Sequence, residues 1–150
     1  MITTEYLSQA ALLESVLSSL SNVVPAPYRK ETLRTVDGPL HVQFGVLIGI
    51  TGQLKGKLIF KGPVELFGAL GESMFGMPLE GEMLKSFAGE LGNMISGGFC
   101  AKVFEQGISI DITSPTIMEG DSRISGFKAG HEVIVSFDGK GPLSLSVLFD

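Results

Sequence analysis

Cysteine is almost missing from this chain, and tryptophan is missing altogether. Cys100 is the single cysteine among 150 residues, which excludes an intrachain disulfide and a cysteine-rich metal site. Charge is sparse as well: 18% of the residues are charged and 44% are hydrophobic, a balance that excludes an intrinsically disordered chain. The composition therefore predicts a folded domain with a sizeable core, and residues 1–150 match the usual size of one domain.

Long apolar runs and basic clusters are also absent. The longest apolar run, Val42 to Ile50, is interrupted by Gln43 and is far shorter than the ~20 residues of a membrane-spanning helix. Glu5 and Glu14 occupy the stretch where a secretory signal would be basic and then apolar. A net charge of −5 with scattered lysines and arginines argues against nucleic-acid binding. We expect a cytoplasmic protein with no membrane insertion and no nucleic-acid partner.

Hydrophobic spacing predicts the elements of the first half. Apolar residues recur at helical intervals from Glu5 to Leu20, and the prolines of Val23 to Tyr28 end that helix. A short strand is expected at Leu33 to Val36. Two runs of alternating apolar residues, 42–50 and 54–60, flank Thr51-Gly52 and predict a β-hairpin.

The second half repeats this order of elements. A short helix is expected from Val64 to Phe75 between Pro63 and Gly76, and a longer one from Met83 to Glu105. Alternating apolar residues then predict strands at 108–112, 116–118, 133–137 and 143–149. We therefore expect one α+β domain of pseudo-duplicated halves, with a mostly antiparallel sheet of about six strands and helices packed on one face.

The long helix carries two distinct faces. At 100° per residue, Leu84, Phe87, Leu91 and Ile95 cluster on one side, which we interpret as the core face together with Gly98. A separate face carries Ser86, Glu90, Asn93 and Gly97. Glu90 and Asn93 are three residues apart, so they point outward together.

Glycine is unusually frequent in this helix. Gly89, Gly92, Gly97 and Gly98 each cost up to ~1 kcal/mol relative to alanine, so a compensating role is expected. Gly98 suits tight packing on the core side, whereas Gly97 would let another surface approach the Glu90/Asn93 face. Exposed Glu and Asn are also common as ordinary solvated residues, although Asn is a poor residue in the middle of a helix.

The spacing Ser86-x3-Glu90-x2-Asn93 in a glycine-rich helix, followed by Pro115 in Thr-Ser-Pro-Thr-Ile-Met-Glu-Gly, resembles the CheC/CheX/FliY family of chemotaxis phosphatases. The strand-turn-strand segment from Ile48 to Phe60 is similar as well. The resemblance extends over nearly the whole chain.

This resemblance implies dephosphorylation of a phosphorylated CheY-type response regulator. Glu90 would engage the regulator's active-site lysine, and Asn93 would hold a water in line with the aspartyl phosphate. Ser86, Gly89 and Gly97 would dock against the partner. The regulator would supply the Mg²⁺, so this chain would bind no cofactor and no metal of its own.

One departure from the family pattern limits the number of sites. CheC-like members often carry a Glu-x-x-Asn motif in each half, but the first helix here offers Glu14-Ser-Val-Leu17. The resemblance is therefore to the CheX branch, with one site and an expected homodimer. The alternative is a non-catalytic binding or adaptor module for a receiver domain. A purely structural subunit would leave the glycines unexplained.

Other candidate residues are better explained as structural. His41 and His131 have no carboxylates at metal-ligand spacing, and Cys100 lacks a strongly activating neighbour. Glu119-Gly-Asp121 is interpreted as a surface turn rather than an acid/base pair. Finally, Lys55, Lys57 and Lys61 are expected to protect an exposed strand edge.

Overall fold

The computed structural model describes residues 9–150 as an α+β fold with three helices and a seven-stranded sheet. The helices are α1 (Gln9–Val23), α2 (Val64–Phe75) and α3 (Gly81–Glu105). The strands are β1 (Tyr28–Thr35), β2 (Leu40–Gly52), β3 (Gly56–Lys61), β4 (Ile110–Ile112), β5 (Thr116–Ile124), β6 (Ala129–Phe137) and β7 (Gly141–Phe149). Within these residues, no helix is long and apolar enough to cross a membrane.

The helices agree closely with the sequence prediction. Helix α2 has the predicted bounds, and it ends because Gly76 adopts a left-handed conformation with φ of 77°. Helix α3 begins two residues before Met83, at Gly81. Helix α1 continues to Val23, and the predicted start at Glu5 lies outside the described residues.

The sheet has seven strands, where about six were expected, and β1 and β5 are longer than predicted. Both are edge strands: β1 pairs only with β6, and β5 pairs only with β2. Their sequences, YRKETLRT and TIMEGDSRI, are largely polar and exposed. An edge strand with solvated side chains lacks the apolar alternation by which strands are predicted, so only 33–36 and 116–118 were recognisable.

The predicted duplication is visible in the topology. The sheet order is β1-β6-β7-β3-β2, with β4 and β5 both paired to β2. The hairpins β2–β3 and β6–β7 meet at the sheet centre, where β3 pairs with β7. Strand β1 of the first half pairs with the second hairpin, and β5 of the second half pairs with the first. Each half therefore completes the sheet of the other.

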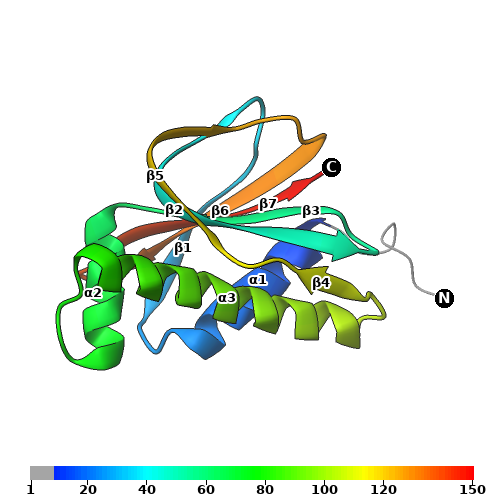
Figure 1. Ribbon diagram of the computed structural model, residues 1–150. Helices are drawn as coiled ribbons and strands as arrows, with labels where there is room; N and C mark the ends of the chain where they lie inside the picture. Colours follow the sequence, from blue (N-terminus) through cyan, green and yellow to red (C-terminus); the bar gives the residue numbers. More distant parts are fainter. Residues whose placement is uncertain (1–8) are drawn as a thin grey trace.

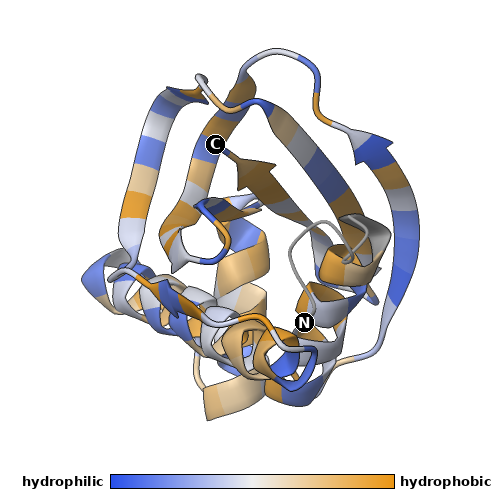
Figure 2. Ribbon diagram, turned by 90° about the vertical axis from the view of Figure 1, so that its right-hand side faces the viewer, coloured by the Kyte–Doolittle hydropathy of each residue, from blue (hydrophilic) through white to orange (hydrophobic). Residues whose placement is uncertain are grey.

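The main core lies between one face of the sheet and the helices, as predicted. Helices α1 and α3 lie side by side across this face, and α2 stands at one end (Figure 1). The alternate residues on the hairpins, such as Leu58 and Phe60, are buried beneath them. The sheet curves upward at the other face (Figure 2), where Ile59 and Leu148 belong to a smaller apolar cluster.

Two surface predictions are wrong. Strand β3 pairs on both sides, with β2 and β7, so Lys57 and Lys61 do not protect a strand edge. Lys55 lies in the turn before β3. The segment 119–121 is not a turn: it lies within β5, where Gly120 has φ of +86° and the register with β2 shifts between Val42 and Phe44.

A buried glutamate ties four strands together on the face away from the helices. The Glu132 side chain is only 1% exposed. It accepts a hydrogen bond from Arg34 Nε at 2.5 Å and another from the Ser144 hydroxyl, and Lys61 Nζ lies 3.7 Å away. Burial alone would raise the pKa of Glu132, but these hydrogen bonds and the charges of Lys61 and Arg34 outweigh it and lower the pKa. The carboxylate thus links β6 to β1, β7 and β3.

Replacing Glu132 by Gln should lower the free energy of unfolding by about 2 kcal/mol near neutral pH, because the cations then lose their counter-charge. A lowered pKa in the folded state stabilises the wild type above the pKa of an unfolded glutamate. That stabilisation disappears as the pH falls through the folded value. Urea unfolding at pH 7 and pH 3.5 should therefore show a gap between wild type and Glu132→Gln that narrows in acid. A gap independent of pH would contradict this account.

Candidate functional site

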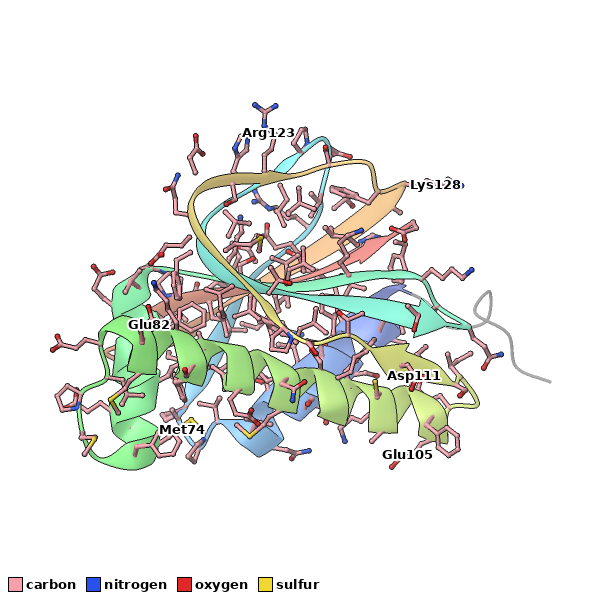
Figure 3. All side chains as sticks on the ribbon, in the orientation of Figure 1. Met74, Glu82, Glu105, Asp111, Arg123 and Lys128 are labelled. Carbon is pink, nitrogen blue, oxygen red and sulfur yellow. The ribbon has the colours of Figure 1, made fainter. Side chains whose placement is uncertain are left out.

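Helix α3 separates a buried stripe from an open one, as its sequence predicts. The residues of the core face, Leu84, Phe87, Leu91 and Ile95, are all buried. The open face carries Ser86, Glu90 and Gly97 exposed to solvent, with Asn93 half-buried between them. Helix α3 runs along the near side of the molecule, with Glu82 near its start and Glu105 at its end (Figure 3).

The side chains of Glu90 and Asn93 are unengaged. Within residues 9–150, neither forms a hydrogen bond or ion pair with another side chain or with the backbone of another element. They lie one helical turn apart on a rigid 25-residue helix, so they are presented together at little conformational cost. An acid and an amide that face solvent side by side can both contact a docked surface.

The glycines of α3 divide into two groups by their surroundings. A Cβ on Gly92 would lie 2.9 Å from Val46 of the sheet, and one on Gly98 would collide with the Ser19 hydroxyl of α1. Gly97 differs, because a Cβ there would have no atom within 4 Å among the described neighbours. Packing therefore explains Gly92 and Gly98, whereas nothing within the fold requires a glycine at position 97.

Gly89 does not lie on the open face. It is buried, and a Cβ there would lie 3.4 Å from Ile117 and 3.6 Å from Pro115. Its small size brings the segment that leads into β5 against α3, so it has no free surface for direct contact with a partner. Pro115 consequently packs against α3 at Gly89, the residue that precedes Glu90. The structure thus brings together two parts of the motif that are far apart in sequence.

The four residues of the open face, Ser86, Glu90, Asn93 and Gly97, include no cation. The only basic residues of α3 are Lys85 and Lys102. Lys85 Nζ lies 3.2 Å from Glu119 and 3.4 Å from Glu82, and hydrogen bonds to these two carboxylates raise its pKa. Because Glu90 is itself an anion, this face on its own would repel a phosphate group. A phosphorylated ligand must therefore bring its own positive charge.

Sequence reasoning missed an apolar groove next to this face. It has a volume of about 480 Å³, and Ser86 and Glu90 form one of its walls. Its apolar lining comes from the end of α2, the following loop and α3: Phe75, Met77, Leu79, Met83, Phe87 and Met94. The signal in the sequence was the presence of three methionines, Met77, Met83 and Met94, around the start of α3 and along it.

The remaining candidates do not form a second reactive centre. Among residues 9–150, no three His, Cys, Asp or Glu side chains are grouped to hold a metal ion. Burial raises the pKa of the half-buried Cys100 thiol, and the charge of Asp111 adds to this effect. The thiol therefore stays protonated and is a poor nucleophile near neutral pH.

The family model and the curated relative that match this chain identify the same family. Residues 44–138 match the family model described as chemotaxis phosphatase CheX. The CheY-P phosphatase CheX of Thermotoga maritima is 32% identical over 124 residues, which cover 78% of this chain and 79% of that protein.

Solved structures share the fold. The chemotaxis protein CheX of Vibrio vulnificus superposes with a TM-score of 0.81 at 22% identity, over 93% of this chain and 99% of that one. The CheX of the CheX–CheY–BeF3–Mg²⁺ complex from Borrelia burgdorferi has a TM-score of 0.68 at 19% identity, over 91% and 94% of the two chains. At these identities the likeness establishes the fold alone.

Two adjacent glycines provide a test of the open face. Gly98→Ala should lower the free energy of unfolding by about 2 kcal/mol, because the new methyl group displaces the Ser19 hydroxyl, which donates a 2.7 Å hydrogen bond to the Ile95 carbonyl. Gly97→Ala should instead stabilise the helix by up to about 1 kcal/mol. Thermal or urea unfolding of the two variants measures both. Equal destabilisation would show that position 97 is not open.

Proposed function

The chain belongs to the chemotaxis phosphatase CheX family, and on that premise we propose that it dephosphorylates the aspartyl phosphate of a CheY-type response regulator. The open face of α3 docks on the regulator's phosphorylation site. The observation that carries the proposal is the solvent-facing pair Glu90 and Asn93, which no described part of the fold uses.

The relatives support this choice of partner. The Thermotoga maritima protein is named for its action on CheY-P, and the Borrelia burgdorferi complex pairs CheX with CheY in the presence of BeF3 and Mg²⁺. The electrostatics of this chain agree with such a partner. The four residues of the open face include no cation, so the Mg²⁺ and the lysine that neutralise the phosphoryl group come from the regulator.

The chemistry then requires little from this chain beyond positioning. Phosphoryl transfer is accelerated chiefly by alignment and by stabilisation of charge. The amide of Asn93 both donates and accepts hydrogen bonds, so it can orient a water in line with the phosphorus without repelling the phosphoryl oxygens. The Glu90 carboxylate contacts the regulator's lysine and sets the register of docking. Neither residue becomes covalently modified.

One site per chain follows from the contrast between the two halves. In α1, the residues at the motif spacing are Glu14 and Leu17. Glu14 forms a 2.9 Å ion pair with Lys30, and Leu17 is buried in the core. At the two motif positions this helix therefore offers neither a free carboxylate nor an amide. The homodimer expected from the family resemblance and the cytoplasmic location expected from the composition remain predictions.

Asn93→Ala should reduce the accelerated phosphate release at least about 100-fold, because the attacking water is no longer positioned. It should leave the affinity for the regulator nearly unchanged. The measurement is phosphate release from a panel of acyl-phosphorylated, Mg²⁺-bound regulators, with Glu105→Ala at the far end of α3 as the matched control. If Asn93→Ala released phosphate at the wild-type rate, the proposed mechanism would be wrong. If the wild-type protein bound a regulator without accelerating release, the chain would be a non-catalytic adaptor module.

Glu90→Ala should weaken binding of the Mg²⁺-bound, beryllofluoride-activated regulator about 10-fold, because the contact with the lysine is lost. Titration by calorimetry or fluorescence measures the dissociation constant. The Gly97→Ala variant should also bind more weakly although it is more stable, since a methyl group there keeps the two surfaces apart. Unchanged affinity in both variants would contradict docking through this face.

A further inference from the structure

The apolar groove between α2 and α3 is shaped by packing contacts within the fold. Leu79 forms its floor and packs so closely on α2 that a Cβ on Gly71 would lie 2.5 Å from the Leu79 side chain. Phe75 contacts Phe87 edge-on, with ring centroids 5.8 Å apart. Gly76, in a left-handed conformation, turns the chain from α2 into the loop that carries Leu79. Contacts within the fold therefore hold the base of the groove in place.

Its rim exposes large apolar side chains to water. Phe75 is 61% exposed, Met83 60% and Met77 52%. Contiguous apolar exposure of this kind is unfavourable in an isolated protein and marks surfaces that become covered. Methionine is suited to such a surface, because its unbranched and polarisable side chain adapts to the shape of a partner.

The charge around the groove is acidic. Glu82 and Glu90 line it, and Glu80 is the exposed neighbour of Leu79. The described residues that line the groove include no cation, and Lys85, next to Ser86, is held between Glu82 and Glu119. An apolar ligand group flanked by lysine or arginine matches this arrangement, whereas an acidic one would be repelled.

The groove is continuous with the proposed phosphatase face, because Ser86 and Glu90 belong to both. Any partner that covers Glu90 and Asn93 therefore covers at least one wall of the groove. Phe104, which is 69% exposed on the same helix, lies outside the groove near the other end of α3. A variant of Phe104 can therefore serve as the control for variants of the groove.

We infer that the α2–α3 groove is a second docking site for the response regulator, and that it receives an apolar side chain from a basic part of the regulator's surface next to the phosphorylation site. This inference rests on the proposed function. It assigns different roles to two parts of one docking surface. The groove provides affinity that does not depend on the phosphoryl group, while Glu90 and Asn93 act at the phosphorylated aspartate.

Contacts that are equal in the ground state and the transition state change KM without changing kcat. The double variant Met77→Ser/Met83→Ser should therefore raise KM for the phosphorylated regulator about 10-fold and leave kcat at the wild-type value. Its affinity should fall equally for the beryllofluoride-activated and the unmodified regulator, both Mg²⁺-bound. The control Phe104→Ser removes an exposed apolar side chain from the same helix and should change neither constant.

The charge of the rim is tested separately. Glu82→Gln should slow association with the activated regulator at low salt and flatten its salt dependence, whereas Glu105→Gln should do neither. If Glu82→Gln and Glu105→Gln behave alike, the partner's group is not basic and that part of the inference is wrong.

The outcomes separate this inference from the proposed function. If wild-type protein releases phosphate and the double variant shows the KM of Phe104→Ser, the groove is no docking site and the phosphatase activity stands. If wild-type protein releases none but still binds a regulator through the groove, the docking site stands and the activity does not. Absence of binding to every regulator overturns both. If the double variant instead changes the molar mass in sedimentation, the groove is covered by a second copy of this chain.

Discussion

The close approach of α3 to the rest of the molecule is the constraint on which the other features depend. Glycine at positions 92 and 98 lets the helix lie directly on the sheet and on α1, where the Ser19 hydroxyl bonds to the Ile95 carbonyl. A helix held on two sides over its middle turns cannot rotate. Its remaining face therefore points to solvent in a fixed direction, and that fixes the orientation of Glu90 and Asn93.

A fixed helix also suits the proposed reaction. In that proposal the partner contributes the charges, and this chain contributes position. Such a division demands a precise docking geometry, which two side chains alone would not hold against thermal motion. The inferred docking in the neighbouring groove would add apolar contact at a defined place on the same helix, so that orientation and chemistry are anchored by neighbouring parts of one surface.

Sequence reasoning succeeded where local pattern and burial agree. The core stripe of α3, the end of α2 at Gly76 and the hairpins were predicted because apolar period and turn residues are local signals. It failed at the polar edge strand β1, whose partner β6 is distant in sequence, and at β3, whose lysines lie in the sheet interior rather than at its edge. The composition of a strand does not show which other strand it pairs with.

The sequence by itself determined which chemical groups α3 presents, because helical period alone places Ser86, Glu90, Asn93 and Gly97 on one face. Only the tertiary structure decided what surrounds that face. It buried Gly89 under Pro115, paired Lys85 with Glu119, and turned the chain at Gly76 so that methionines from the following loop and from α3 line one groove. These contacts join residues whose positions relative to one another follow from packing, and packing is a property of the whole chain.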